Sequence, residues 1–420
     1  MSAGVALTLI SYWRMRRALL VFLLSLILVV SRRPDVLFHA QFWAEDGRLW
    51  FADAYNCGLL PLLQPAVGYF QTLPRLAALM AQALPLAAAP LFLNVIAILI
   101  QVLPVPFLLS SRCRELGSYA ARCLFALLYI GLPNSHEMHA NITNAQWRLA
   151  LLALLVLFAR PGRTALWNAF DVVVVALCAL TGPFIIFIAP IAAILYFKDG
   201  RDRWQRSLML MTGAGGALEI LSVLLTGGSH RPIYAVRGAT TELLIQILAR
   251  QVFLAPLLGR RTVSEFSFHS GLGLAVALAV TLIGLAIELY VVLKAPLAWK
   301  TFIAFCLCIF AVSLASPTTA SPQWPNLLAS GGVRYWFFPM LGFIASVIWL
   351  IQPRNPAAVR GVAWVLLVIM FFGVVQDWGH PRPYDFRFQA YARSFSEAPA
   401  GTTMYIPINP VGWAMKLVKH

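Results

Sequence analysis

The chain alternates between apolar runs and polar connectors, and eleven of the runs are candidates for membrane-crossing helices. The predicted spans are residues 18–31, 90–109, 119–132, 147–159, 169–182, 183–197, 207–226, 271–293, 301–315, 336–352 and 361–376. The run 73–84 is apolar but short and bracketed by prolines, so we predict an interfacial or re-entrant helix on the outer side. The predicted fold is therefore all-α: a polytopic transmembrane protein of about 11 spans, with interfacial helices and outer loops.

Composition supports this interpretation and excludes a water-soluble globular protein. Hydrophobic residues make up 60% of the 420 residues, charged residues only 11%, and the mean hydropathy is +0.78. Membrane lipid is therefore an expected partner. The net charge of +16, from 32 basic and 16 acidic residues, would suggest nucleic acid in a soluble protein. Here topology and contact with anionic lipids or phosphate groups explain it better, and we predict no nucleic-acid partner.

The distribution of basic residues predicts the orientation. Arg14, Arg16 and Arg17 precede the first run, and no small-residue cleavage pattern follows it, so we predict an uncleaved first span. Short inner connectors are denser in Lys and Arg than the outer segments. The sequence thus predicts a multi-pass protein of the cytoplasmic (inner) membrane, with its N-terminus inside and its C-terminus outside.

We predict one integral-membrane domain, residues 1–420, with three long outer segments. These are a first outer loop with an interfacial helix (32–89), a basic outer loop (227–270) and a C-terminal tail (377–420). The tail is too apolar to be free, so we expect it to dock on the other outer loops or on the membrane.

Two adjacent carboxylates, Glu45 and Asp46, stand in the first outer loop between Trp43 and Gly47. Held near lipid, such acids have raised pKa values, which suits a general base that activates an acceptor hydroxyl. They could also bind a divalent cation, Mg or Mn, through oxygen ligands. A solvated turn anchored by Trp43 at the membrane interface is the alternative.

A second polar cluster lies in the connector 133–146 and at the start of the next span. Amide side chains can satisfy sugar hydroxyls, and an aromatic face can cover a sugar ring, so the composition resembles a sugar-binding surface. Metal binding by the histidines, or an ordinary polar loop, remain alternatives. The predicted substrate-binding residues are Trp43, His136, Glu137, His139, Asn141, Asn144, Gln146, Trp147 and Tyr335.

Basic residues provide the third feature. The outer segment 227–270 carries five arginines (Arg231, Arg237, Arg250, Arg260 and Arg261) against Glu242 and Glu265, a net charge of 5 − 2 = +3. Guanidinium groups near a bilayer surface are natural phosphate ligands, although general attraction to lipid headgroups would look the same. Arg334 stands at the outer mouth of a late span, where it could pair with a phosphate while Tyr335 lines the groove; interfacial anchoring is the alternative.

These features together resemble the GT-C superfamily of integral-membrane glycosyltransferases. The shared features are the acidic pair Glu45-Asp46 in the first outer loop, an interfacial helix after it, many spans, and Arg334 before a late span. The resemblance implies transfer of a sugar from a polyprenyl-phosphate carrier to a glycan, lipid or protein acceptor on the periplasmic, outer face of the cytoplasmic membrane. It implies that Asp46 or Glu45 serves as catalytic base or metal ligand.

The resulting hypothesis is an inverting transfer reaction. Asp46, or alternatively Glu45, would deprotonate the acceptor hydroxyl, while Arg334, with Arg231 or Arg237, would stabilise the departing polyprenyl phosphate. A lipid-linked glycan ligase or polymerase, a membrane transporter or flippase, and a noncatalytic assembly factor are the alternative functions.

Overall fold

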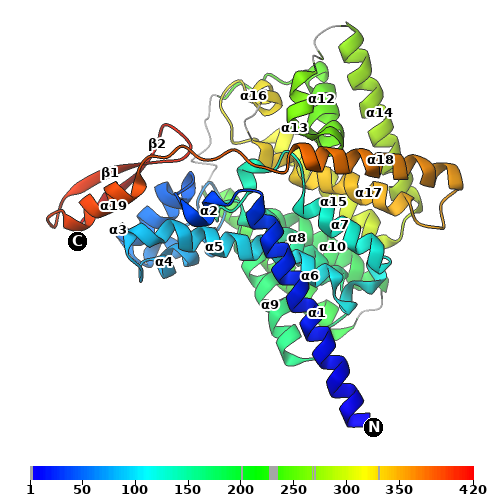
Figure 1. Ribbon diagram of the computed structural model, residues 1–420, viewed down its shortest axis with the longest axis horizontal. Helices are drawn as coiled ribbons and strands as arrows, with labels where there is room; N and C mark the ends of the chain where they lie inside the picture. Colours follow the sequence, from blue (N-terminus) through cyan, green and yellow to red (C-terminus); the bar gives the residue numbers. More distant parts are fainter. Residues whose placement is uncertain (1–2, 200–201, 227–234, 267, 269–270, 330–331) are drawn as a thin grey trace.

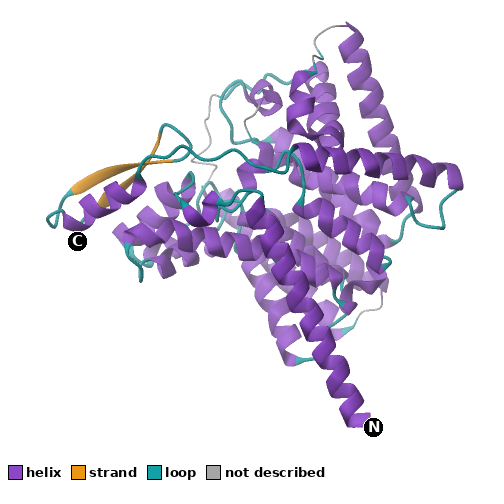
Figure 2. Ribbon diagram, in the orientation of Figure 1, coloured by secondary structure: helices purple, strands orange, loops and turns teal. Residues whose placement is uncertain are grey.

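The computed structural model describes residues 3–199, 202–226, 235–266, 268, 271–329 and 332–420, with side chains described from Arg16 onward. Most of the chain is helical, and the longer helices pack into one bundle (Figures 1 and 2). The longer helices are α1 (Ala3–Ser31), α5 (Ala89–Val102), α7 (Tyr119–Ile130), α8 (Ala145–Phe158), α9 (Ala165–Ala179), α10 (Phe184–Asp199), α11 (Arg203–Thr226), α14 (Gly271–Lys294), α15 (Leu297–Ala315), α17 (Phe337–Leu350) and α18 (Ala357–Gln376).

Shorter elements connect and cap the bundle. The α-helical ones are α2 (Asp35–Phe38), α3 (Ala52–Cys57), α4 (Thr72–Ala81), α6 (Pro104–Leu109), α12 (Thr241–Ile247), α13 (Ala255–Glu265), α16 (Gln323–Ala329) and α19 (Phe388–Glu397). The 3₁₀- and π-helical ones are η1 (Asp46–Phe51), η2 (Leu60–Leu63), η3 (Leu86–Ala88), η4 (Ser111–Leu116), η5 (His136–Met138), η6 (Leu248–Leu254) and η7 (Val333–Trp336).

The membrane class predicted from the apolar runs is confirmed. In the described part of the chain, seven helices are long and apolar enough to cross a bilayer, and four apolar helices of 10–17 residues accompany them. Each of the eleven predicted spans coincides with helix, and the predicted interfacial run 73–84 contains α4. Eleven crossings, the orientation of the termini and the choice of membrane stay predictions.

The most buried helices lie at the centre of the bundle. Every residue of α17 is buried, and so is nearly every residue of α8. A helix that is apolar on all sides needs neighbours on all sides, and α7, α14, α15 and α18 supply them around α17. Lipid-facing helices such as α14 instead leave large aliphatic side chains exposed.

Two elements differ from the expectation. Thr241–Glu265, within the segment predicted as the basic outer loop 227–270, is helical, with a kink at Gly259, and is one of the seven long apolar helices. Between Glu242 and Arg260 its only charge is Arg250, so the run is apolar enough for helix packing. The second difference is an antiparallel hairpin, β1 (Thr403–Ile408) and β2 (Trp413–Val418), in a chain predicted to be all-α.

The hairpin docks on the segment 32–89, predicted as the first outer loop, as the apolar composition of the tail predicted. Together with α19 it projects from the bundle beside α3 (Figure 1). The backbone of Trp43 pairs with Asn409, and the side chain of Asn56 donates to the carbonyl of Lys416 at 3.0 Å. Phe42, Phe51 and Phe388 pack together beneath it. The tail therefore supports the loop that carries the acidic pair.

Two glycines allow α13 and α18 to touch. At Gly259, which has a φ of +80°, the helix is kinked, and the backbone amides of Arg260 and Arg261 then donate to the carboxylate of Asp377. A methyl group at Gly373 would lie 2.6 Å from the carbonyl oxygen of Leu257. Backbone cannot rotate away as a side chain can, so this position admits only hydrogen.

Gly373→Ala should therefore destabilise the protein by about 1–3 kcal/mol, the usual cost of overpacking. The measurement is the midpoint of thermal unfolding of the purified protein in detergent. Gly361→Ala is the matched control because it lies in the same helix and its methyl group meets nothing within 4 Å. Equal midpoints for the two variants would contradict the close contact.

Candidate functional site

The candidate site surrounds the connector 133–146, which joins α7 to α8 at one end of the bundle. Three segments far apart in sequence contact this connector. The first outer loop reaches it through Asp46, η7 through Arg334, and the end of α18 through Asp377. Acidic and basic groups predicted from the sequence to act together thus lie at the same end of the bundle.

Asp46 holds the first outer loop against this connector. Its side chain is buried, and its carboxylate accepts from the backbone amides of Ile142 at 3.2 Å and Thr143 at 2.8 Å and from the Thr143 hydroxyl at 2.5 Å. The same hydroxyl accepts from the indole of Trp50 at 2.9 Å. Burial raises the pKa of Asp46 to about 7, although the hydrogen bonds from Thr143 and Ile142 oppose that rise.

The backbone before Asp46 explains how the acid is aimed inward. Ala44 adopts a φ of +45°, unusual for a residue with a side chain, and its amide donates to the carbonyl of Asn409. The amide of Asp46 donates to the carbonyl of Trp43 at 2.8 Å, which closes a turn. The turn directs adjacent acids into different surroundings, and it leaves Trp43 half-buried against the tail.

Glu45 is the freer of the two acids. It is half-buried, and within the described residues its carboxylate makes no hydrogen bond and no ion pair. It lies close enough to Arg334 to interact with it electrostatically. A carboxylate with unoccupied oxygens beside a guanidinium group can still accept a proton from a ligand, whereas the oxygens of Asp46 are already engaged.

Arg334 and Glu137 form an ion pair across the site. Glu137 accepts from the backbone amide of Arg334 at 3.0 Å and from its guanidinium. The same guanidinium donates to the carbonyl and the hydroxyl of Thr318, each at 3.1 Å, and Tyr335 contacts this group through its own hydroxyl. The side chains of Arg334 and Glu137 are 25% and 17% exposed to solvent, so a ligand can still reach the pair.

A cavity with several polar and basic residues in its wall lies near this ion pair. Its wall includes His136 and Val333, the chain neighbours of Glu137 and Arg334, together with Arg250 and Arg260. The Nδ1 of His136 and the Nε of Arg250 are buried without a hydrogen-bond partner in the described part of the chain. Two guanidinium groups in one wall, one of them with an unused N–H donor, favour an anionic ligand.

The basic segment therefore contributes different arginines from those we singled out. Arg237 has an exposed side chain and does not line the cavity, and Arg231 lies outside the described residues. Arg250 and Arg260 line the cavity instead, and phosphate binding by any of these arginines stays a prediction. The helical spacing of apolar residues in 241–265 could have indicated that Arg250 lies on a helix and not in an exposed loop.

The predicted sugar-binding amides mainly hold the connector in shape. Asn141 donates to the carbonyl of Glu137 at 2.7 Å and accepts from the amide of Asn144 at 3.0 Å, while Asn144 donates to the same Glu137 carbonyl at 3.2 Å. Gln146 is buried and donates to the carbonyl of Thr143. Trp147 is buried among Phe184, Tyr335, Phe337 and Phe338 and covers no open surface.

The two histidines of the connector are held neutral by burial. Burial, and next the charge of Arg260, lowers the pKa of His136 to about 4. Burial, followed by the charge of Arg33, lowers the pKa of His139 well below its ordinary value, and its ring packs against His380 at 4.8 Å between centroids. Across the described residues, no group of three or more His, Cys, Asp or Glu side chains could hold a metal ion.

Stability should depend on pH with opposite signs at these groups. Between the ordinary pKa of an Asp, 3.8, and about 7, the folded protein keeps a proton on Asp46 that the unfolded chain releases, so stability falls as the pH rises. Between about 4 and 6.5, the unfolded chain protonates His136 and the folded protein does not, so stability rises with pH. Asp46→Asn removes only the first effect.

Between pH 4 and 6.5, the free energy of unfolding of Asp46→Asn should therefore rise with pH more steeply than that of the parent protein. The two slopes should differ by about 1.4 kcal/mol per pH unit, the value for one titrating group. Thermal unfolding in detergent at a series of pH values measures both slopes. Parallel curves would show that Asp46 ionises as freely in the folded as in the unfolded chain.

No protein-family model matches the chain, and no curated protein matches it. What the site does must therefore be inferred from its own geometry.

Proposed function

We propose that this protein is a GT-C-like membrane glycosyltransferase that moves a sugar from a polyprenyl-phosphate carrier to an acceptor hydroxyl on a glycan, lipid or protein. The proposed place is the outer, periplasmic face of the cytoplasmic membrane. The observation that carries the proposal is that the connector 133–146 contacts both the loop of the acidic pair, through Asp46, and Arg334, through Glu137, near a cavity that contains two more arginines. Such a transfer requires an acid close to a basic phosphate site.

The cavity supplies the binding groups for the donor phosphate. Arg250 and Arg260 would hold the phosphate oxygens, and His136, whose Nδ1 has no other partner in the described residues, would add a hydrogen bond. Arg334 stands next to the cavity through Val333 and already carries the acid Glu137. It would take up the negative charge that develops as the phosphate leaves.

Glu45 is the proposed general base, and Asp46 is the proposed positioning residue. The acceptor oxygen attacks the anomeric carbon, its proton passes to Glu45, and the bond between that carbon and the phosphate oxygen breaks. The products are the glycosylated acceptor and the polyprenyl phosphate, and the anomeric configuration inverts. Asp46 acts through its hydrogen bonds to Ile142 and Thr143, which fix the loop that carries Glu45.

The donors around Asp46 do not fit a divalent cation. A cation needs free oxygen atoms, and here three N–H and O–H groups point at the two carboxylate oxygens. Glu45 alone would be a single ligand. We therefore propose a transfer in which the chain's own charged groups carry the chemistry.

The experiment is a transfer assay with the full chain in proteoliposomes. A panel of polyprenyl-phosphate monosaccharides carrying a radiolabelled sugar is supplied together with envelope glycan as acceptor. Transfer of label, with release of polyprenyl phosphate, supports the proposal. Movement of intact donor across the bilayer would indicate a flippase, and a strict requirement for a diphosphate-linked oligosaccharide would indicate a ligase or polymerase; either result overturns it.

The cavity arginines can be tested in the same assay. Arg250→Met or Arg260→Met should raise the KM for the donor about 10- to 100-fold, because each removes a charge-assisted hydrogen bond to phosphate. Arg261→Met is the matched control, since Arg261 is exposed and does not line the cavity. Equal KM values for all three variants would place the donor phosphate elsewhere.

A further inference from the structure

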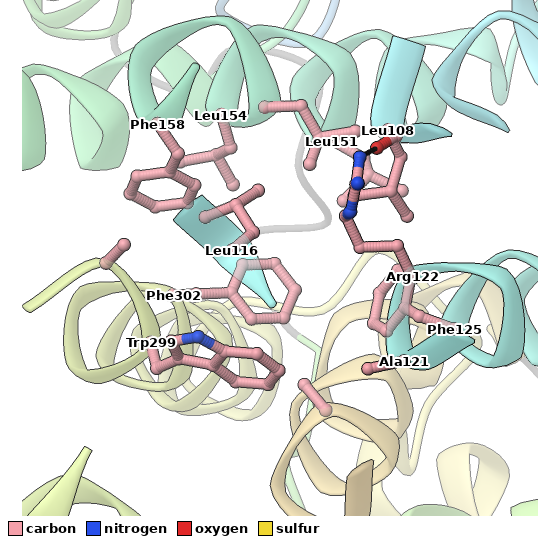
Figure 3. Close-up of a pocket in the computed structure, with 13 residues that line it drawn as sticks. Leu108, Leu116, Ala121, Arg122, Phe125, Leu151, Leu154, Phe158, Trp299 and Phe302 are labelled. Atoms are coloured by element: carbon pink, nitrogen blue, oxygen red, sulfur yellow. Dashed lines mark hydrogen bonds between the residues drawn. The ribbon is translucent and has the colours of Figure 1, made fainter. Parts of the chain in front are cut away.

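A second cavity lies between α7, α8 and α15 (Figure 3). It is bounded by the first half of α7, the last half of α8 and the beginning of α15. The candidate site instead surrounds the end of α7 and the beginning of α8. The two cavities are therefore separated by the length of these helices, and this inference does not rest on the proposed function.

The wall of this cavity is almost entirely hydrocarbon. Leu151, Leu154 and Phe158 line it from one face of α8, and Trp299 and Phe302 face them from α15 (Figure 3). Arg122 is the only charged residue in the wall, and its guanidinium donates to the carbonyls of Leu108 at 2.8 Å and Ser110 at 2.7 Å. A wall of this kind offers a ligand dispersion contacts and almost no hydrogen bonds.

The mouth of the cavity is basic. The connectors 110–122, 294–300 and 351–354 meet beside the wall residues Leu116 and Trp299, which we take as the mouth, because a methyl group at Gly117 would lie 3.7 Å from the amide of Gln352 and 4.0 Å from the ring of Trp299. These three connectors contain six basic residues and one acid, Glu115. Arg160 pairs with Glu115, and Asp171 pairs with Arg112. The charges left over are on Arg114, Arg122, Lys294, Lys300 and Arg354.

We propose that this cavity binds one acyl chain of an anionic phospholipid, whose headgroup lies against the basic mouth. An apolar chamber in a membrane protein is filled by hydrocarbon from the surrounding bilayer, and the excess positive charge at the mouth selects the headgroup. Arg114, Lys294 and Arg354 are exposed and Lys300 is half-buried, so their ammonium and guanidinium groups can reach a phosphodiester. The bound lipid would brace α7, α8 and α15 against one another.

The test uses phosphatidylglycerol with a photoactivatable diazirine in its acyl chain, in vesicles containing the full-length protein. Labelled peptides should contain the cavity-lining parts of α8 and α15. Ala298→Phe, which fills the half-buried mouth, should reduce this labelling about tenfold. Ala311→Phe is the matched control, because Ala311 lies on the same helix with an exposed side chain outside the cavity.

Two further measurements keep the proposal falsifiable. Leu154→Trp fills the cavity from the opposite wall, so a folding defect in one variant leaves the other informative; both are compared with the parent by thermal unfolding. Replacing Lys300 and Arg354 by serine should remove the preference for phosphatidylglycerol over phosphatidylcholine. Labelling that is spread over exposed lipid-facing residues and unchanged by Ala298→Phe overturns the proposal, as does displacement by a polyprenyl phosphate but not by phosphatidylglycerol.

Discussion

Glu45→Gln should reduce the rate of sugar transfer about 10²- to 10⁴-fold, the usual contribution of a general base, and should leave the protein folded. The amide keeps the size of the side chain but cannot accept the proton of the acceptor hydroxyl. Glu45 has no hydrogen bond within the described residues, so its replacement removes no structural contact there. The measurement is kcat in proteoliposomes with saturating donor, together with the unfolding midpoint.

Asp46→Asn is the informative comparison because the neighbouring acid has a different environment. An asparagine amide would turn its NH₂ group toward at least one of the N–H donors of Ile142 and Thr143, so we expect a loss of about 1–3 kcal/mol of stability. Two results would reverse the assignment of the base. They are a nearly fully active Glu45→Gln variant that keeps the activity inflection near pH 7, and an Asp46→Asn variant that is stable but inactive.

The helices were predictable because hydrophobicity is local information. The run 271–293 became α14 to within one residue, and the run 361–376 became α18, which begins four residues earlier, at Ala357. The helix at 241–265 was missed for a physical reason: Arg250, Pro256 and Gly259 interrupt the run, and these residues are typical of loops. In the structure this helix packs against α14 and α18. These contacts stabilise it despite the three interrupting residues, and they cannot be predicted from the local sequence pattern.

The site was predictable only in part because it depends on contacts far apart in sequence. The pattern singled out the acidic pair, the connector 133–146 and Arg334, and in the structure Asp46 and Arg334 both contact this connector. Which acid is free was not predictable, since Asp46 is engaged by amides 96 and 97 residues away. The density of Asn and Gln indicated sugar binding, yet Asn141 and Asn144 use most of their hydrogen-bonding groups to brace their own loop.

Asp171→Asn should cost about 3–5 kcal/mol of stability, because it breaks a buried ion pair from one side. Arg112 on η4 donates to both oxygens of Asp171 on α9, at 2.8 and 2.6 Å, and the carboxylate is fully buried. The guanidinium also lies 5.1 Å from the ring centroid of Phe107 and 4.9 Å from that of Trp167. Without its partner the charge stays among these rings, and Arg112 has no other ion-pair partner among the described residues.

Glu115→Gln is the control. Glu115 lies on the same short helix as Arg112, and its ion pair with Arg160 joins two side chains that are largely exposed. Solvent screens that pair, so we expect a change of only about 0–1 kcal/mol. The double variant Arg112→Met with Asp171→Leu should recover most of the loss, because it removes both charges and keeps the volume. If Asp171→Asn and Glu115→Gln shift the unfolding midpoint equally, or if the double variant is no better than Asp171→Asn, burial is not what makes the first pair costly to break.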